Sequence, residues 1–273
     1  MGMLTEDWVF SYSQLSTFDE CPYAFYLEKI ERNPTVLSNA FQEQGLLIHD
    51  LIDQWAKGTL TKEELPELYK TRFPREVLTP FPRRMANYQK KAYDQGLQYF
   101  EEFDEFKGYK ILDSEYRFTT NLCGRQFTGV IDMVLEDEST GEMIILDHKS
   151  KSESTFKKEA KKMYRQQYLY SIAAFSKYGK MPDILMFNLF KENGMRKSIP
   201  FSEDEFHGVV EWAEDVMSRM EDYDLFEFLQ TKSVARTKTG KLREDMFCTE
   251  ICDMRGVCEQ GNPAFYREDL DID

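Results

Sequence analysis

Apolar residues recur at helical spacing near the start of the chain. Leu15 and Phe18 lie three positions apart, which predicts a short helix capped at its N-terminus by Ser13. Pro22 would disrupt a helix interior but suits the first position of a new helix. We therefore expect two short helices in succession over residues 13–31.

Two longer helices follow in the pattern. Leu47, Leu51 and Trp55 are spaced by four residues and predict a helix over residues 38–57. A turn-rich stretch with several prolines comes next, and a long helix is expected over about residues 82–106. The first hundred residues are therefore predicted to be mainly helical.

The character of the chain then changes. "YKILDSEYRFTT", "RQFTGVIDMVLE" and "MIILDHKS" are β-like runs, and a turn signal at residues 139–141 separates the second from the third. Residues 155–178 return to a helical pattern. "DILMFNLFK" and "MRKSIPFS" are expected to be two further strands, joined by a hairpin turn at residues 192–194.

A last helix completes the pattern. Ser202 and Glu205 fit a capping box that opens a helix running to about Met220. The core order is thus α, β, β, β, α, β, β, α, which is typical of an α/β fold. A single domain over residues 1–273 accommodates it.

The second and third strands carry unexpected charges. Because side chains alternate along a strand, Asp147 and Lys149 share one face and His148 lies on the other. If the strands pair through the turn between them, Asp132 and Asp147 meet at one end of the sheet. Two adjacent carboxylates repel each other unless a cation lies between them, and Mg²⁺ or Mn²⁺ is the natural cation for oxygen ligands. Lys149 would then lie beside a metal-bound water.

The alternative is that these are strand-end residues in water, with Lys149 paired to Asp147 or Glu153. For the D-x-K pattern alone this alternative is favoured. The pattern becomes specific only together with other motifs.

Those motifs are present, and they resemble a known family. "GVID" and "DHK" resemble the G-x-I-D…D-x-K signature of RecB-like nucleases in the PD-(D/E)xK superfamily. "SYSQLSTFDECPYAFYL", "GLLIHDLID", "LDSEYRF" and "QQYLY" resemble further elements of that family in the same order, and the resemblance runs from residue 11 to residue 258.

The resemblance implies a restriction-endonuclease-like core, with a mixed central sheet flanked by helices. It implies a helical N-terminal region over residues 1–107, a catalytic core over 108–222 and a cluster-binding tail over 223–273. It places His49, Asp132, Asp147 and the carbonyl of His148 as metal ligands, although position 148 is more often Tyr, Phe or another apolar residue in the family.

Further roles come from the same resemblance. Glu115 would assist the metal site, and Lys149 would position the attacking water. Gln166 and Tyr170 share a helix face and would support the lysine and the scissile strand. The same face carries Lys158 and Lys162, with Arg165 beside them. These residues either hold a DNA backbone or form a solvated basic face over the core.

The cysteine pattern favours metal ligation over disulfides. Five cysteines in a chain that lacks a secretory signal do not suggest a disulfide framework, and the spacing does not give the two close pairs of a zinc site. Cys21 with Cys248, Cys252 and Cys258 resembles the 4Fe-4S staple of the iron–sulfur subset, which includes the AddB nuclease domain and CRISPR-associated exonucleases. Cys123 has no partner in this pattern. The alternative is that all five are free thiols.

Charge and hydropathy limit the classes of function. The net charge of −14 argues against non-specific coating of nucleic acid but does not exclude a nuclease, because a metal neutralises local carboxylates. No apolar run approaches the roughly 20 residues of a membrane span, and the start lacks the features of a signal peptide, so we expect a cytoplasmic protein.

Together these features predict a metal-dependent DNA exonuclease acting on DNA ends or single strands in recombination, repair or phage and CRISPR DNA processing. The chain has no "GxxxxGK[ST]" loop, so a helicase, recombinase or other DNA-processing partner would supply any unwinding. Two alternatives remain open: a nuclease-fold subunit that acts mainly in assembly, and a nuclease acting on RNA.

Overall fold

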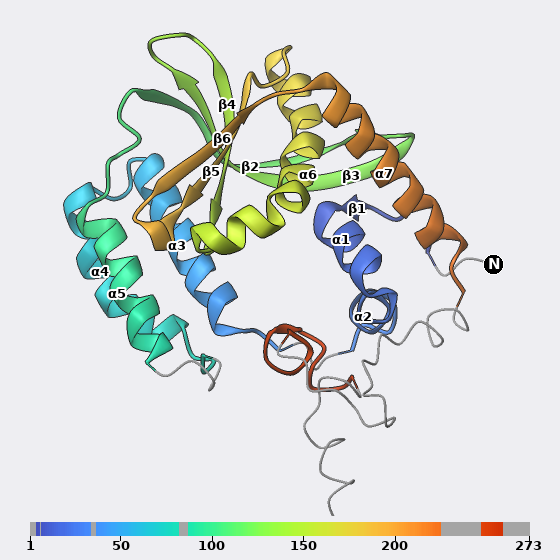
Figure 1. Cartoon of the computed structure of the whole chain (residues 1–273), viewed down its shortest axis with the longest axis horizontal. Coiled ribbons are helices and arrows are strands. Elements are labelled where there is room, and N and C mark those ends of the chain that lie inside the picture. Colours follow the sequence, from blue (N-terminus) through green and yellow to red (C-terminus); the bar gives the residue numbers. More distant parts are fainter. Residues whose placement is uncertain (1–3, 6, 34–36, 82–86, 225–246, 259–273) are drawn as a thin grey trace, which may run out of the picture. The chain divides into compact units, whose positions relative to one another are not determined.

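A computed structural model describes residues 4–5, 7–33, 37–81, 87–224 and 247–258 (Figure 1). The chain divides into two compact units, one made of Met1–Asn39 with Ala213–Asp273 and the other of Ala40–Trp212. The prediction of a single nuclease domain stays a prediction. Within the described ranges, no helix is both long and apolar enough to cross a membrane.

A mixed sheet forms the centre of the Ala40–Trp212 unit. Its strands are β2 (Tyr109–Leu122), β3 (Arg125–Asp137), β4 (Met143–Lys149), β5 (Ile184–Leu189) and β6 (Met195–Pro200). They lie in this order across the sheet, and β4 pairs with β5 in parallel while the other pairs are antiparallel. The parallel pair requires a crossover, which α6 (Glu153–Tyr178) provides.

Three helices pack against one face of this sheet (Figure 1). They are α3 (Ala40–Ala56), α4 (Leu65–Glu76) and α5 (Tyr88–Glu101), with the 3₁₀ turn η2 (Lys62–Glu64) before α4. Their buried residues form one hydrophobic cluster with alternate residues of the strands, including Leu146 of β4. This cluster is the main core of the unit.

The opposite face of the sheet packs against α6. Phe187 of β5 lies 5.1 Å from Phe156 and 4.9 Å from Tyr164, ring centroid to centroid. Its neighbour Met186 belongs to the cluster on the other face. Alternation along β5 therefore separates the two packing layers, as expected for a buried strand.

The strand pattern predicted from the sequence is confirmed. Helix α4 was not predicted, because its prolines suggested a turn-rich stretch. Pro74 lies inside this helix, whose buried face is Leu65, Tyr69 and Phe73. The burial of two aromatic rings and a leucine offsets the hydrogen bond that the proline removes. Helix α5 begins at Tyr88, and residues 82–86 lie outside the described residues.

The turn predicted at residues 192–194 joins β5 and β6 as expected. It comprises the end of a 3₁₀ helix, η3 (Phe190–Glu192), and two residues with positive φ, Asn193 and Gly194. Helix α7 (Glu203–Asp222) then follows. The Oγ atom of Ser202 accepts a hydrogen bond from the backbone N–H of Glu205 at 3.4 Å, as one half of the predicted capping box requires.

The other unit contains β1 (Phe10–Ser11), α1 (Tyr12–Glu20), α2 (Pro22–Phe25) and two π-helical turns, η1 (Tyr26–Ile30) and η4 (Phe247–Ile251). The two short helices and the proline start of the second are confirmed. The predicted cap was wrong: Ser11, not Ser13, caps α1, and its hydroxyl accepts from the N–H of Gln14.

Candidate active site

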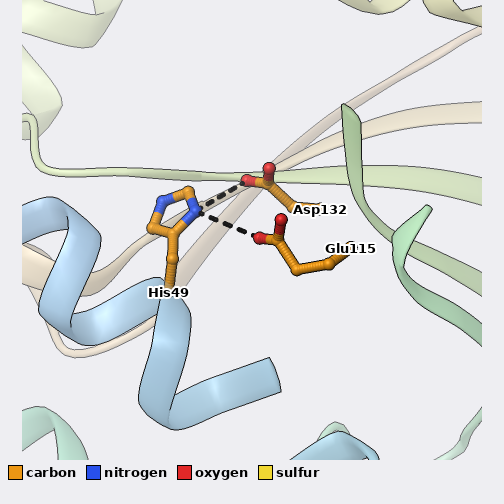
Figure 2. Close-up of side chains that lie close together, drawn as sticks. All are labelled: His49, Glu115 and Asp132. Atoms are coloured by element: carbon orange, nitrogen blue, oxygen red, sulfur yellow. Dashed lines mark ion pairs between the residues drawn. The ribbon is translucent and has the colours of Figure 1, made fainter. Parts of the chain in front are cut away.

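Three side chains of metal-ligand type converge where α3 meets the sheet (Figure 2). His49 Nδ1 lies 3.5 Å from Asp132 Oδ2 and 3.9 Å from Glu115 Oε1. One ligand atom from each residue lies within 4.8 Å of the others. Among the described residues this is the group whose spacing suits one metal ion.

The fold brings these residues together from three elements. His49 lies on α3, beside the buried positions Ile48 and Leu51 that anchor this helix. In the antiparallel ladder the pairs on either side of Glu115 and Asp132 are Ser114–Met133 and Tyr116–Ile131. Glu115 and Asp132 therefore lie opposite each other on neighbouring strands.

Glu115 has an unusual backbone for a strand residue. Its φ of 49° lies in the left-handed region, which costs an L-residue roughly 1–2 kcal/mol. A register shift between Ile111 and Asp113 lies just before it. Such strain persists where the surrounding structure holds it, and it is common at functional sites.

Asp147 and Lys149 lie beside the group of His49, Glu115 and Asp132. Pairing of Met133 with Leu146 makes Asp147 the neighbour of Asp132 across the strands. Lys149 Nζ lies 2.8 Å from Asp147 Oδ2 and donates a hydrogen bond to Gln166 Oε1 at 3.2 Å. The sequence thus predicted correctly that these residues come together, although Asp147 lies outside the tight group of His49, Glu115 and Asp132.

Crowding of the carboxylates shows in their electrostatics. Burial, aided by Asp147, raises the pKa of Asp132 to about 7 although His49 opposes the shift. Burial alone would lower the pKa of His49, but Asp132 and Glu115 outweigh it and raise that pKa to about 9. The site therefore holds more buried negative charge than its own side chains compensate.

Lys149 behaves differently. Burial would lower its pKa, but Asp147 and Asp132 outweigh burial and raise the pKa above its usual value. The lysine is therefore an ammonium group at neutral pH. In this state it donates hydrogen bonds.

The backbone of His148 links two of the metal-ligand candidates. Its N–H donates to Asp132 Oδ2 at 2.7 Å, and its carbonyl oxygen lies 3.0 Å from His49 Nε2. The side chain points into the core, as predicted, and only 3% of the residue is exposed. The peptide of this residue is therefore part of the site, while its ring is part of the core.

The ring of His148 is held by residues that sequence reasoning missed. Asn188 Nδ2 lies 2.9 Å from His148 Nδ1 and donates a second hydrogen bond to the hydroxyl of Tyr99 at 2.9 Å. An amide has no lone pair on its nitrogen, so Asn188 donates and His148 Nδ1 accepts. The available signal was an asparagine inside the apolar run "DILMFNLFK".

Tyr170 contacts the glycine of the "GVID" motif. A Cβ atom at Gly129 would lie 2.7 Å from ring atoms of both Tyr170 and Phe118. The rings of Tyr170 and Phe118 meet edge to face at 5.1 Å. This contact explains physically why position 129 requires a glycine: the strand must admit the tyrosine ring.

The predicted DNA-binding residues lie along α6. Lys158 is exposed, while Lys162 and Arg165 are half-buried. The guanidinium of Arg165 lies 4.5 Å over the ring of Trp212 in α7. Their role in DNA binding stays a prediction.

The cysteine candidates lie in the other unit. Cys21 falls between α1 and α2, and Cys248, Cys252 and Cys258 lie in or just after η4, all of them half-buried. Burial, with smaller contributions from Cys258 and Cys21, raises the pKa of Cys252 to about 11. Three of the four candidate thiols are therefore near one another.

One known protein family matches this chain in sequence. The model of the PD-(D/E)XK nuclease superfamily matches residues 9–259, nearly the whole chain. The chain belongs to the PD-(D/E)XK nuclease superfamily. Asp147, His148 and Lys149 supply the D-x-K part of that name, and the mixed sheet flanked by helices agrees with its fold.

Two solved structures resemble this member of the superfamily at low sequence identity. A protein from Eubacterium rectale, named as a candidate exonuclease, is 14% identical with a TM-score of 0.45, over 78% of this chain and 79% of that one. SSO0001 is 13% identical with a TM-score of 0.32, over 79% and 86%. None of the curated proteins compared with the chain matches it. The assignment therefore rests on the family model.

The residues of the site fit a divalent cation. Two carboxylates and an imidazole converge, and the buried carboxylate of Asp147 lies beside them, 2.8 Å from the Lys149 ammonium. Oxygen ligands with one imidazole suit Mg²⁺ or Mn²⁺, the latter accepting nitrogen more readily. Such a cation would also compensate the negative charge of Asp132, whose pKa is raised by burial and, to a smaller extent, by Asp147.

Proposed function

We propose that this protein is a metal-dependent DNA exonuclease of the RecB-like type. The observation that carries the proposal is the placement of Lys149, supported by Gln166, beside the group of His49, Glu115 and Asp132. Phosphodiester hydrolysis requires a cation to stabilise charge on the phosphate and a donor to orient the attacking water. At this end of the sheet, the carboxylates and the imidazole would hold the cation, and Lys149 is the donor.

The metal would be held by His49, Asp132, Asp147 and the carbonyl of His148, with Glu115 assisting. His49 would bind the ion through Nδ1, which faces Asp132 and Glu115, while its Nε2–H donates to the His148 carbonyl oxygen at 3.0 Å and orients the ring. The bound ion would polarise the phosphate and lower the pKa of water. No other group of described residues offers this donor set.

Lys149 performs the remaining task. As an ammonium group it donates a hydrogen bond to the attacking water or to a phosphate oxygen. Asp147 and Gln166 hold its Nζ atom in place. Tyr170 supports the strand that carries Asp132 by packing against Gly129. Lys158, Lys162 and Arg165 would contact the DNA backbone along α6.

The cysteines support a second element of the proposal, a structural 4Fe-4S cluster on Cys21, Cys248, Cys252 and Cys258. Cys21 and Cys258 both raise the pKa of Cys252, which agrees with a site shared by these three thiols. Four thiolates suit such a cluster. Iron analysis of anaerobically purified protein tests this element, and colourless, iron-free protein contradicts it. A Cys252→Ser variant should lose iron while Cys123→Ser keeps it.

Cleavage of end-labelled DNA tests the main proposal. Single- and double-stranded substrates, and RNA of the same sequence, are incubated with Mg²⁺ or Mn²⁺ and the products are sized. We expect processive shortening from DNA ends, absent with chelator. Equal cleavage of RNA would favour the RNA alternative, and unchanged cleavage by Lys149→Ala would contradict the site assignment.

A further inference from the structure

Lys191 is a buried lysine at the end of the sheet that carries Lys149. It lies in η3, directly after β5, and only 7% of the residue is exposed. Its Nζ atom lies 4.5 Å from the ring centroid of Phe41 and 5.6 Å from that of Tyr88. Two aromatic faces therefore flank a cation that has been removed from water.

The charge of Lys191 lies in an unfavourable electrostatic setting. Among the residues that the structure describes, no carboxylate pairs with the Lys191 ammonium. Its pKa is lowered to about 8, first by burial and then by Lys151 and Lys91. Cation–π contacts return less free energy than an ion loses when it leaves water. The isolated protein thus carries an unfavourable charge here.

The topology explains why the lysines gather. In the parallel pair of β4 and β5, Lys149 is the register partner of Leu189. Two residues further along each segment, Lys151 and Lys191 follow the ends of β4 and β5, so both lie at the end of the sheet that carries Lys149. Lys91 approaches from α5 and is exposed. An anion can therefore reach the group from the surface.

The cluster also differs in sign from the rest of the molecule. Lys151 pairs with Glu159 at 2.5 Å, which leaves the other two ammonium groups in excess. The chain as a whole carries a net charge of −14. A local excess of positive charge, with the Lys191 ammonium buried, marks a place in such a chain where a negative ligand is favoured.

We propose that Lys191, with Lys151 and Lys91, binds a phosphate group of the nucleic acid strand that enters the candidate active site. The identity of this strand rests on the proposed function, whereas binding of a phosphate anion does not. A phosphate would pair with the ammonium in a setting kept dry by Phe41 and Tyr88, where charge-assisted hydrogen bonds are strong. It is either an internal phosphodiester or the phosphate at a strand end.

Thermal unfolding with inorganic phosphate tests the anion site without DNA. Wild-type protein should melt at a higher temperature in phosphate than in chloride of equal ionic strength. Lys191→Met keeps an unbranched apolar side chain between the rings and should lose the phosphate-specific part of the shift. Lys90→Met is the matched control, because Lys90 is exposed on the same helix as Lys91 and pairs with Asp94 at 2.6 Å. It should respond as wild type.

Cleavage kinetics with Mn²⁺ test the link to the substrate. Lys191→Met should raise KM for DNA about tenfold with kcat nearly unchanged, as expected for a lost charge-assisted hydrogen bond. The slope of log affinity against log salt concentration should become shallower by about one. Substrates with a 5′-phosphate and with a 5′-hydroxyl distinguish an internal phosphodiester from an end phosphate as the bound group. Only a site for the end phosphate discriminates between these substrates.

The outcomes separate the two proposals. If wild type does not cleave nucleic acid but shows a phosphate shift that depends on Lys191, the anion site stands and the proposed function fails. If cleavage is normal but Lys191→Met leaves KM, the salt slope and the phosphate shift unchanged, the anion site is overturned. Loss of stability in Lys191→Met, with an unchanged phosphate shift, identifies Lys191 as purely structural and also overturns it.

Discussion

The N–H of His148 donates a hydrogen bond to Asp132 Oδ2 at 2.7 Å. One peptide thereby joins the D-x-K strand to the carboxylate of the neighbouring strand. The ring of the same residue is held by Asn188 in the core. The position of the candidate metal ligands therefore depends on a buried polar contact on the far side of β4.

Asn188→Leu should weaken metal binding. Without the amide donor, His148 Nδ1 loses its partner and the peptide that contacts Asp132 and His49 loses its anchor. Residues that orient metal ligands typically contribute 10–100-fold to affinity, so we expect a loss of about tenfold. Titration of the protein with Mn²⁺ by electron paramagnetic resonance measures this directly. Tyr99→Phe keeps the Asn188–His148 contact and should lose less; equal losses in both variants would contradict the role of Asn188.

Lys149→Met should affect the chemical step and not metal binding. The variant removes the donor that orients water or phosphate, which costs about 10²–10³-fold in rate. Single-turnover cleavage measures this rate, and Mn²⁺ titration should give an affinity close to that of wild type or higher. Lys180→Met is the control, because Lys180 is exposed and pairs with Asp183 at 3.2 Å. If the variant raised KM but left the single-turnover rate unchanged, Lys149 would act in substrate binding and not in the chemical step.

Gly129→Ala should destabilise the fold. Its new methyl group would lie 2.7 Å from the rings of Phe118 and Tyr170, so a buried ring must move. Overpacking of this kind costs about 1–3 kcal/mol. Gly208→Ala, in α7, meets nothing within 4 Å and should stabilise by up to about 1 kcal/mol. Chemical denaturation of both variants checks the prediction, and equal stabilities would contradict the packing argument.

The buried Lys191 should make stability depend on pH. Its pKa is about 8 in the folded chain and about 10.4 when unfolded, so the unfolded chain binds more protons between these values. Wild-type stability therefore gains from this group as pH rises from 8 to 10. At pH 7 the charged lysine costs on the order of 3 kcal/mol.

Lys191→Met removes that cost, so it should be more stable than wild type at pH 7 in chloride. The advantage should shrink as the pH approaches 10. Urea unfolding at a series of pH values, with Lys90→Met measured in parallel, tests both statements. A constant difference between Lys191→Met and wild type across this range would show that the lysine does not titrate as a buried group.

Local chemistry determined much of this protein. The alternation in "GVIDMVLE" and "MIILDHK" specified strands, their faces and the meeting of Asp132 with Asp147, because side-chain direction in a strand depends only on position. Turn residues marked the connections at residues 139–141 and 192–194. Helix α4 and the Ser11 cap were missed, since local rules penalise proline and do not choose between neighbouring serines.

The tertiary structure alone decided the rest. The left-handed backbone of Glu115, the contact between Asn188 and His148, and the fit of Tyr170 against Gly129 join residues far apart in sequence. The burial of Lys191 between Phe41 and Tyr88 is of the same kind. Such relationships depend on packing and on removal from water, which act only once the chain is folded, and periodicity along the sequence carries no record of them.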